Sequence, residues 1–502
     1  MASSATVRLR RAWRRLRGRP VGAQVATLAV AAVVVAGAAY GISSATSQAP
    51  AGSSGTTLAG SVGGANGVGV DQASTSSRGV TPDTINVVFP VANLTSLSST
   101  LGFASDVEFS EQAAAIHTFV NEINDSGGIH GRKINAMIEN FDPTSEADMR
   151  AKCLDWTQST PVFAVVDGLG TWNGDNQLCI TQEGSTPLIG QWTTVSDWTQ
   201  KGSPYLWWTG PDQAVVLRTL VEWGKASHLL GGGRLVGVVA GDRSSDQLAL
   251  TKYLLPDFAR AGLPAPVVET LASNVNDSAT TNAEAPLVVQ RLKARGVQSV
   301  MPLIPFNSFF PYLQAETQQQ YFPRLLLSDY ESTITEALGL IPVPYEKALD
   351  GQLGISVETL GGIDDTRPAS QGGYVTGARS CYETWIAHNK QPPGTGPFID
   401  SQGPIVSWCQ AIRLFAEAAR RAGPDLNRKT FVEAMASITN FQGALTPILS
   451  FGPHKFYGPV EYRVLRVHNN DPKHNACVLK YDGQPQGTCW QIVQDFRPLA
   501  SG

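Results

Sequence analysis

The sequence predicts an α/β fold in which helices cover parallel sheets, and three consecutive segments carry this prediction. Residues 84–91 (TINVVFPV) read as a buried strand, and apolar positions from Phe109 to Ile123 recur with the spacing of one helix face. Residues 133–140 (KINAMIEN) then read as a second strand, which Asp142-Pro143 closes. A strand, a helix and a strand in this order form a βαβ unit, which implies parallel pairing.

Two turns separate the helix from the second strand. Gly127 and Gly128 end the helix, because glycine takes the left-handed cap conformation without a Cβ clash. A second turn at His130-Gly131 follows almost at once, and Ile129 between the turns is placed to fold back onto the last helical turn. We therefore expect a tight reversal of the chain at this point.

The alternation continues along the chain, so two α/β blocks follow one another and a third segment comes after them. Further strands are expected at residues 161–168, 185–192, 234–242, 266–271, 299–306 and 324–330. Further helices are expected at residues 211–223, 248–261, 286–295, 308–319 and 405–422, with another starting at Lys429.

The N-terminal part has a composition of its own. Residues 1–20 hold seven arginines and no acidic residue, and residues 21–41 carry no charge at all. As a helix, this apolar stretch spans roughly 30 Å, about the thickness of one bilayer core. Residues 43–78 are rich in Ser, Gly and Ala and read as a flexible linker, and folded sequence begins near Gly79.

A basic start followed by an apolar stretch predicts export, with residues 1–20 in the cytoplasm and residues 21–42 as a signal or anchor helix. A buried core helix is the alternative reading of the apolar stretch. We favour an uncleaved anchor, because the stretch is long for a cleaved signal. Cleavage near the small residues 43–45 is the other possibility.

Charge and cysteine content describe the exported part further. Without residues 1–20, 31 basic residues face 42 acidic ones, a net charge of −11. Such an acidic domain is a poor partner for nucleic acid. An even number of cysteines in an exported chain predicts disulfides, most simply between sequence neighbours, although six cysteines allow 15 connectivities. Zinc is the competing reading, but no CxxC or HxxxH pair occurs. The cysteines are Cys153, Cys179, Cys381, Cys409, Cys477 and Cys489.

Polar and aromatic residues follow the expected strands, where open parallel sheets bind ligands. Hydroxyls and backbone amides suit a carboxylate, an acid suits an ammonium, and aromatic rings suit an apolar group. For any single residue, ordinary loop polarity is the simpler explanation. The candidates are Asn93, Thr95, Thr171, Trp172, Thr193, Thr194, Asp246, Phe306, Asn307, Asp329 and Glu331.

Motifs of enzymes are missing from the sequence. Gly168-Leu169-Gly170 is followed by Gly174, one residue too far for the dinucleotide fingerprint. There is no GxxxxGK[ST], HExxH or GxSxG. The seven histidines are scattered, and His468 and His474 read as solvated loop residues. We therefore expect no catalytic site, cofactor or metal, with a generic hydrolase pair as the alternative.

The stretch FVNEINDSGGIHGRKI (119–134) closely resembles the hallmark segment of substrate-binding proteins of branched-chain amino acid ABC transporters. Other segments fall in the order of that family, among them GVTPDTINVVFPVANLT, LIGQWTT, PYLWWTGPDQAVVLRTLVEW, RLVGVVAGDRSSDQL and LLPDFARAG. The resemblance covers about residues 79–465. Its GGIxGRK element is fairly specific, whereas the other segments are convincing only together.

The resemblance implies a type I periplasmic-binding fold with two doubly wound parallel-sheet lobes joined by three crossovers. The first lobe would hold about residues 79–211 and 332–450, and the second about residues 212–331 and 451–502. The ligand would be clamped between the lobes. The double turn would be a compact βαβ reversal in the first lobe, and Cys153–Cys179 matches a disulfide common there.

The family also implies roles for residues of the site. Thr171-Trp172 and Thr193-Thr194 match loops that hold the α-carboxylate of an amino acid. An acid that meets the ammonium falls near Asp329 to Glu331, and Phe306 matches an aromatic residue that lines the cleft. This sequence departs from the family at residues 244–246, because no tyrosine stands there. Specificity for amino acids is therefore an open question at the level of sequence.

Three classes of function follow from these observations. The leading one is an extracytoplasmic receptor that clamps a small amino-acid-like or carboxylate ligand and delivers it to ABC transporter permease subunits. It would be anchored to the cell membrane by residues 21–41, or secreted after cleavage. A membrane-tethered ligand sensor on the same fold is the second class, and an extracellular enzyme is the third.

Overall fold

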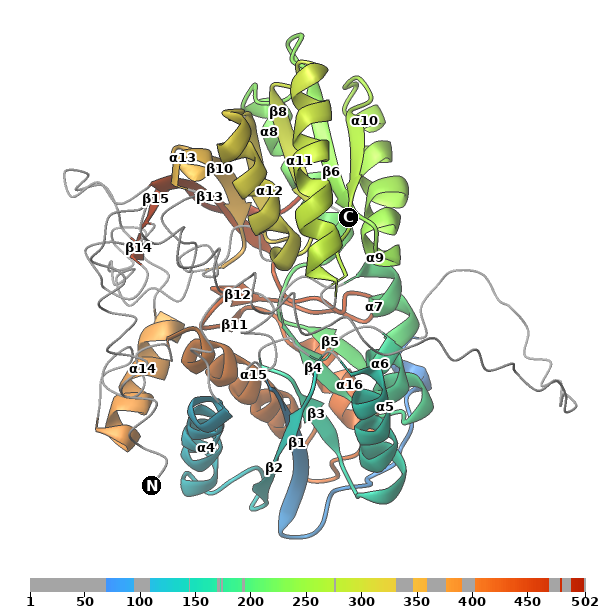
Figure 1. The fold of residues 1–502 in the computed structure, drawn as a ribbon. Helices are drawn as coiled ribbons and strands as arrows, with labels where there is room; N and C mark the ends of the chain where they lie inside the picture. Colours follow the sequence, from blue (N-terminus) through green and yellow to red (C-terminus); the bar gives the residue numbers. More distant parts are fainter. Residues whose placement is uncertain are drawn as a thin grey trace, which may run out of the picture. The chain divides into compact units, whose positions relative to one another are not determined.

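The computed structural model describes most of the chain after residue 68 (Figure 1). The chain divides into two compact units, Met1–Gly64 and Ala65–Gly502. The N-terminal region expected at residues 1–20 and the helix expected at residues 21–42 lie outside the described residues. Among the residues that are described, no helix is long and apolar enough to cross a membrane. The described residues are 69–93, 109–143, 145–168, 172, 175–191, 195–274, 277–330, 346–358, 376–390, 402–468, 479–480 and 489–500.

The first lobe is built on a five-stranded parallel sheet with the order β2-β1-β3-β4-β5. Seven of the nine residues of β1 are buried, because helices cover both faces of the sheet. The register pairs Val87 with Ala136 on one side and with Ala164 on the other. The strands are β1 (Thr84–Ala92), β2 (Lys133–Phe141), β3 (Ala164–Val166), β4 (Leu188–Gly190) and β5 (Leu206–Trp208).

Two helical layers enclose this sheet. The core on one face includes apolar side chains of α4, α15 and α16, and the core on the other face includes those of α5, η2 and η3. The helices of the first lobe are η1 (Val70–Gln72), α4 (Phe109–Asp125), α5 (Glu146–Leu154), η2 (Asp155–Ser159), α6 (Asp175–Leu178), η3 (Cys179–Glu183), α7 (Ser196–Gly202), α14 (Thr376–Asn389), α15 (Gln402–Arg421) and α16 (Arg428–Ser437). A small antiparallel pair, β11 (Phe441–Gln442) and β12 (Ile448–Leu449), follows them.

The double turn after α4 has the expected form. The φ angles of Gly127, Gly128, His130 and Gly131 are all positive. Ile129 and Arg132 form an antiparallel bridge, and Ile129 is 1% exposed in the first-lobe core. A Cβ on Gly128 would lie 2.1 Å from the carbonyl oxygen of Arg132, so only glycine fits. The two turns therefore bury an isoleucine while the chain reverses into β2.

The second lobe contains an eight-stranded sheet with the order β14-β15-β13-β10-β9-β8-β6-β7. Strands β6 to β10 pair in parallel, as expected, but β13, β14 and β15 extend the sheet with antiparallel pairing. The strands are β6 (Val236–Gly241), β7 (Val267–Leu271), β8 (Ser299–Leu303), β9 (Arg324–Ser328), β10 (Leu353–Ser356), β13 (Glu461–His468), β14 (Leu479–Lys480) and β15 (Cys489–Pro498).

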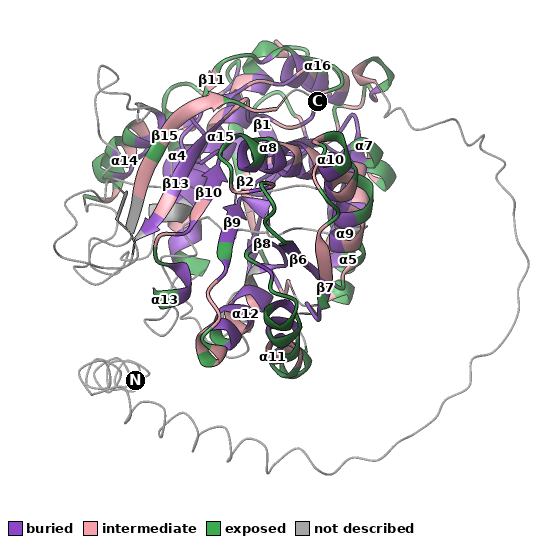
Figure 2. Cartoon of the chain, turned by 90° about the horizontal axis from the view of Figure 1, so that it is seen from above, coloured by how far each residue is buried: buried purple, intermediate pink, exposed green. Residues whose placement is uncertain are grey.

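Helices also cover both faces of the second sheet, and their inward faces are buried while their outward faces are exposed (Figure 2). They are α8 (Gln213–Ala226), α9 (Ser244–Leu248), η4 (Ala249–Leu254), α10 (Leu255–Arg260), α11 (Ser278–Ala294), α12 (Phe306–Gln319) and α13 (Glu346–Leu349).

Several sequence predictions need correction. His468 is the last residue of β13 and not a loop residue. Helix α11 begins eight residues before Pro286, because the Asp277 side chain caps it by accepting from the amide of Thr280. The lobe boundaries stay predictions. Strand β10 lies within the segment 332–450 that was expected in the first lobe, but it pairs with β9 of the second sheet.

Two crossovers between the lobes lie side by side. One follows β5 and leads into α8, and the other runs from β12 to β13. The amide of Trp208 donates to the carbonyl of Phe456, and the amide of Gly458 donates back to the carbonyl of Trp208, each over 2.8 Å. A third crossover between β10 and α14 would include residues 359–375, which lie outside the described residues.

Two of the expected disulfides are present. Cys153–Cys179 joins α5 to η3, and Cys381–Cys409 joins α14 to α15. The third expected pair stays a prediction, because Cys477 lies outside the described residues.

Candidate ligand-binding site

The carboxyl ends of the first-lobe strands form one side of the candidate site. Asp167 follows β3 directly and is fully buried, and its carboxylate accepts a 2.7 Å hydrogen bond from the amide of Trp172. Gln191 follows β4, and its side chain donates to Ser407 on α15 over 2.9 Å. Asn93 follows β1 and donates its amide proton to Phe141. Two buried polar side chains and one backbone hydrogen bond thus hold the ends of three strands in place.

Trp172 lies inside the first lobe, behind the carboxyl ends of its strands. Its indole is fully buried and packs against Phe141 and Trp156, with ring centroids 5.0 and 4.8 Å away. Its carbonyl accepts from the Gln177 side chain over 2.9 Å. The ring therefore supports the loop after β3 from inside the lobe, and direct contact of Trp172 with a ligand stays a prediction.

Two glycines bring tryptophan rings against the strand ends. A Cβ on Gly190 would lie 1.3 Å from the ring of Trp208, and one on Gly168 would lie 2.4 Å from the ring of Trp408. No side chain larger than hydrogen fits at either position without moving a buried ring. The ends of β3 and β4 therefore rest on aromatic side chains.

The carboxyl ends of the two sheets meet at α7. The carboxylate of Asp197 accepts hydrogen bonds from Lys252 over 2.6 Å and from the Tyr253 hydroxyl over 2.5 Å. Helix α7 follows β4 of the first sheet, and η4, which holds Lys252 and Tyr253, comes after β6 of the second. This contact therefore places the strand ends of both lobes on the same side, as a site between two lobes requires.

Asp246, expected to face a ligand, is held inside the second lobe. It is fully buried, and both carboxylate oxygens accept 2.8 Å hydrogen bonds from the guanidinium of Arg243. Tyr330 donates to the same carboxylate over 2.7 Å, and Gln213 donates to Tyr330 over 3.2 Å. About a third of the Arg243 side chain remains exposed, so the network presents a cation rather than an acid at this strand end.

Asp329, the expected partner of a ligand ammonium, is also buried. Its carboxylate accepts a 2.6 Å hydrogen bond from the amide of Val357. Burial raises the pKa of Asp329 to about 7, although the amide of Val357, the hydroxyl of Ser356 and the charge of Arg463 act in the opposite direction. Arg463 lies on β13 and is fully buried. Asp329 therefore joins β9, β10 and β13 within the second sheet, and an ammonium contact stays a prediction.

The remaining candidates are described in part or not at all. Phe306 begins α12, and Asn307 donates to the carbonyl of Ser273 over 3.4 Å. The other candidates lie outside the described residues, and their roles stay predictions: Thr95, Thr171, Thr193, Thr194 and Glu331.

Sequence reasoning missed Asp167, Gln191, Ser196, Asp197 and Arg243. Asp167 and Gln191 lie inside the strands expected at residues 161–168 and 185–192, and they follow the strands only in the structure, where β3 ends at Val166 and β4 at Gly190. Arg243 follows the strand expected at residues 234–242, so the rule that selected the threonines also selects it. No local pattern identifies Ser196 and Asp197, because their significance comes from partners on the other lobe.

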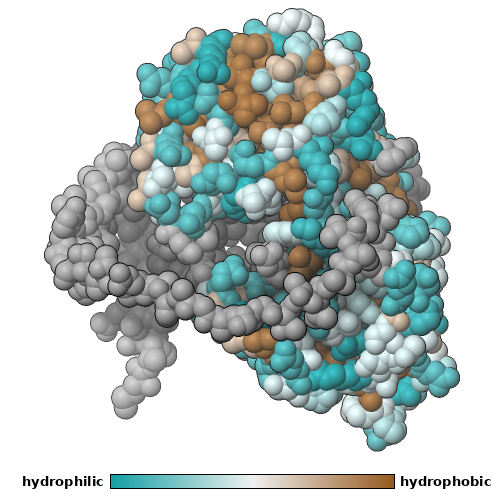
Figure 3. Space-filling view, turned by 90° about the vertical axis from the view of Figure 1, so that its right-hand side faces the viewer, coloured by the Kyte–Doolittle hydropathy of each residue, from teal (hydrophilic) through white to brown (hydrophobic). Residues whose placement is uncertain are grey.

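The large apolar side chains that are exposed by more than a third come from five separate segments of the described residues. Scattered exposure of this kind is normal for a globular protein. In Figure 3 brown residues also gather in a band on the upper part of the face. No group of metal-binding side chains occurs among the residues described. The exposed apolar residues are Phe109, Leu235, Leu287, Ile386 and Val493.

Two parallel-sheet lobes that are joined by crossovers, with their carboxyl strand ends on a common side, define the class of two-lobed ligand-binding proteins. The profile of the periplasmic binding protein family matches residues 88–344, which is more than half of the chain. The chain belongs to this family, whose members are substrate-binding receptors and not enzymes.

The solved structures of similar fold include substrate-binding proteins of ABC transporters. A fatty acid ABC transporter substrate-binding protein from Thermomonospora curvata has a TM-score of 0.58 and 18% identity, over 84% of this chain and 94% of that chain.

Two further structures contain bound molecules. A solute-binding protein from Rhodopseudomonas palustris HaA2, in complex with p-hydroxybenzoic acid, has a TM-score of 0.60 and 14% identity, over 84% of this chain and 98% of that one. A branched-chain amino acid ABC transporter protein from Thermus thermophilus, with bound valine, has a TM-score of 0.59 and 13% identity, over 83% and 97%. No curated protein sequence matches the chain. Identities this low establish the fold alone.

Proposed function

We propose that this protein is an extracytoplasmic solute-binding receptor that clamps a small carboxylate between its lobes and delivers it to an ABC permease. The observation that carries the proposal is the contact of α7 with η4, because it brings the carboxyl strand ends of both sheets to one side. Open parallel sheets bind ligands at these ends. Membership of the periplasmic binding protein family supports the same function.

The buried acids favour a carboxylate without an amine. Asp246 is occupied by Arg243 and Tyr330, and Asp329 is held by Val357 within the second sheet. Neither acid is exposed by more than 2%. The partially exposed Arg243 adds positive charge at the second-lobe edge, whereas hydroxyls at Thr171, Thr193 and Thr194 suit a carboxylate from the first lobe. Similar proteins bind p-hydroxybenzoic acid in one case and valine in another.

A membrane-tethered ligand sensor is the second candidate, and the uncharged segment 21–41 favours it. The two functions differ in what happens to the N-terminus in the cell. N-terminal sequencing of the protein from membranes distinguishes a retained segment from a cleaved one. A permease that co-purifies with the protein supports delivery for transport.

Calorimetry with a panel of probes tests the ligand class. We expect p-hydroxybenzoate or a fatty acid to bind and valine to bind weakly or not at all. Charge-assisted hydrogen bonds contribute about 1.5–3 kcal/mol each, so Thr193→Val or Thr194→Val should weaken binding roughly tenfold to a hundredfold. Thr251→Val is the matched control, because this hydroxyl bonds only to its own helix in the second lobe.

Two acid variants test for an amine on the ligand. Asp329→Asn and Glu331→Gln should leave the affinity for a simple carboxylate within a factor of a few. If valine binds and either acid variant reduces its affinity as strongly as the threonine variants do, the ligand is an amino acid. If all four variants bind every probe like the parent, the site lies elsewhere.

A further inference from the structure

Residues 70–78, called the strap below, lie against the first lobe and run to the start of β1 (Figure 1). A flexible linker is expected from the sequence up to residue 78, but these residues are packed. The side chain of Ala73 is 7% exposed and belongs to the first-lobe core, and Val70 packs against the same core. Thr75 and Ser77 remain exposed, so the strap lies on the surface of the lobe.

The backbone of the strap bonds to two parts of the first lobe. The amide of Ser74 donates to the hydroxyl of Tyr205 over 2.6 Å. The carbonyl of Ser76 accepts from the amide of Arg428 over 2.9 Å. Arg428 is the first residue of α16, and the first amides of a helix have no partner within the helix. The strap therefore supplies an acceptor to the start of α16.

Arg78 ends the strap and caps a second helix. Its guanidinium donates to the carbonyls of Trp156 and Thr157 over 3.1 and 2.9 Å, and to that of Thr160 over 2.5 Å. Trp156 and Thr157 belong to η2, and Thr160 is its C-cap. The last carbonyls of a helix lack partners within the helix, and a cation is favourable near them. One side chain of the strap thus satisfies three carbonyls at the end of η2.

Gly79 joins the strap to the first sheet. Its φ angle is +86°, and a Cβ at this position would lie 2.2 Å from the amide nitrogen of Phe163. The carbonyl of Gly79 accepts from the amide of Asn86 on β1 over 2.8 Å. The chain is therefore held closely at the point where the strap leads into β1.

The hydrogen-bond partners of the strap lie at the amino ends of the first-lobe strands. Tyr205 directly precedes β5, and Thr160 precedes β3. Arg428 also donates to the carbonyl of Gly184, ahead of β4, over 2.6 Å. The candidate ligand site is built at the other edge of this sheet, where the strands have their carboxyl ends. The strap therefore leaves that edge open.

We propose that the strap fixes the preceding chain to the first lobe alone, so that the second lobe stays free to close on a ligand while the N-terminal part holds the protein. Among the described residues, every hydrogen-bond partner of the strap belongs to the first lobe or to the strap itself. The docking stands on these contacts, whereas its consequence for ligand closure rests on the proposed function.

Hydrogen exchange of the full chain without added ligand tests the docking. Amides of the strap should exchange at least about tenfold more slowly than in the urea-unfolded chain. Tyr205→Phe removes the acceptor of the Ser74 amide and should raise exchange in the strap severalfold. Tyr321→Phe is the matched control, because it removes a hydroxyl that donates to the Val297 carbonyl in the second lobe.

A second pair of variants tests the cap on η2. Arg78→Met removes three hydrogen bonds and should raise exchange severalfold both in the strap and in residues 155–160. Arg150→Met is its control, because Arg150 forms an exposed ion pair with Glu183 in the same lobe. Exchange of the strap at the unfolded rate, or unchanged exchange in both Tyr205→Phe and Arg78→Met, overturns the docking. Equal increases in the two controls do so as well, because they would indicate general loosening.

Trypsin provides an independent readout, because Arg78 is the first basic residue after Arg19. In the folded full chain, the bond between Arg78 and Gly79 should be cut at least about tenfold more slowly than in a synthetic peptide of residues 70–88. Mass spectrometry of the products measures both rates. Equal rates would mean that the strap is a free linker.

Exchange with a saturating ligand tests whether the strap belongs to the first lobe alone. The protein is measured with whichever of p-hydroxybenzoate, a fatty acid or valine binds in calorimetry. Exchange in the strap should be the same with and without this probe, because its partners do not move relative to it. A change in the strap on binding overturns the restriction to one lobe. If none of the probes binds, the proposed function is at fault, and exchange without ligand still decides the docking.

Discussion

At the scale of single residues, the ammonium of Lys455 shows how a partly buried charge is satisfied without a carboxylate partner. It donates to the carbonyls of Ser450 and Tyr457 over 2.5 and 2.9 Å and to those of Gly458 and Pro459 over 3.3 Å. It also lies 4.4 Å from the ring centroid of Tyr457. All of these residues belong to the crossover between β12 and β13. The Lys455 side chain therefore connects four carbonyls of this crossover.

Replacement of Lys455 by methionine should destabilise the protein. The substitution keeps most of the side-chain volume but leaves the carbonyls without a donor, and bonds to a charged group contribute about 1.5–3 kcal/mol. We expect a loss of this size in urea unfolding. Lys429→Met is the control, because Lys429 is paired with Glu433 near the surface and such pairs contribute about 0–1 kcal/mol. Equal losses for the two variants would contradict the assigned role.

The pH dependence of stability provides an independent check on Lys455. Burial lowers the pKa of Lys455 to about 8, with a small opposite effect from Asp212, whereas an unfolded lysine has a pKa near 10.4. Between these values the unfolded chain binds a proton that the folded chain has released. The free energy of unfolding should therefore rise with pH in this window. The stability of Lys455→Met, measured over the same range, should lack this contribution; parallel curves for both proteins would show that the lysine titrates normally.

The sequence allowed part of the site to be predicted at this scale and not the rest. The rule that ligands bind after parallel strands led to Asp246 and Asp329, and both do follow strands of the second sheet. The rule does not say whether the carboxylates of these two residues already form hydrogen bonds with other groups of the protein. Arg243 is three residues away from Asp246, but Val357 and Arg463 are far from Asp329 in sequence. Long-range partners of this kind follow from the fold and not from local patterns.

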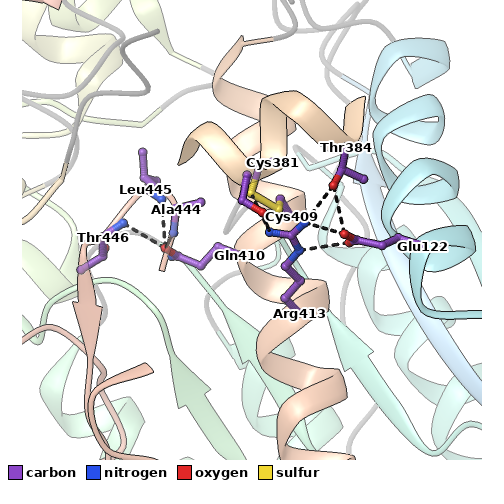
Figure 4. Close-up of a disulfide and its surroundings, with 10 residues drawn as sticks. Glu122, Cys381, Thr384, Cys409, Gln410, Arg413, Ala444, Leu445 and Thr446 are labelled. Atoms are coloured by element: carbon purple, nitrogen blue, oxygen red, sulfur yellow. Dashed lines mark hydrogen bonds and ion pairs between the residues drawn. A yellow bond between two sulfur atoms is a disulfide. The ribbon is translucent and has the colours of Figure 1, made fainter. Parts of the chain in front are cut away.

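At the scale of elements, α14 is attached to the rest of the first lobe by a disulfide and by the hydrogen bonds of one arginine (Figure 4). The disulfide Cys381–Cys409 joins it to α15. Arg413 of α15 donates to both carboxylate oxygens of Glu122 on α4, over 3.0 and 2.6 Å, and to the hydroxyl of Thr384 on α14 over 3.0 Å. The guanidinium thus joins three helices beside the disulfide.

Removal of the disulfide by Cys381→Ser with Cys409→Ser should destabilise the protein without releasing α14 completely. The bonded cysteines are 28 residues apart, and the chain-entropy treatment gives about 3–4 kcal/mol for a loop of this size. We expect a lower midpoint in urea and faster amide exchange in α14. The pair Cys153→Ser with Cys179→Ser is the matched control, because its separation of 26 residues is similar. That control should leave exchange in α14 unchanged; faster exchange there would show that the effect is not local.

The accuracy of the element predictions depended on how apolar each strand is. The apolar runs of β1, β6, β8 and β9 were predicted because parallel strands are buried on both faces. The antiparallel strand β13 was missed, because its sequence EYRVLRVH contains two arginines and an acid. One of these, Arg463, is fully buried and interacts electrostatically with Asp329, which directly follows β9. Strand β5 was missed as well.

At the scale of the whole molecule, the cysteine content makes a simple prediction. Two of the three expected bridges are present among the described residues, and the third would join Cys477 to Cys489. Thiol titration of the denatured, unreduced protein should therefore find essentially no free thiol. A peptide map of the unreduced protein should contain a linked pair that includes residues 477 and 489. Two free thiols would disprove this third bridge.

The crossovers indicate where the lobes can move relative to each other. Residues 456–458 pair with Trp208 and so belong to the first lobe. Asp212 already caps the first helix of the second lobe, and the amide of Leu499 donates to Val460 beside β13. The change from one lobe to the other therefore occurs within residues 209–211 in one crossover and at residues 459–460 in the other. Hinges commonly consist of a few such residues between rigid elements.

Ligand binding should close the lobes about these short segments, because only a closed arrangement lets both lobes contact one small molecule, and a ligand shifts the population toward the state that it contacts best. Small-angle scattering of the protein, saturated with whichever probe binds in calorimetry, should show a smaller radius of gyration than the protein alone. Thr193→Val at the same probe concentration should show an intermediate value, since weaker binding leaves more of the population open. An unchanged radius of gyration at full saturation would mean that the ligand binds to one lobe only.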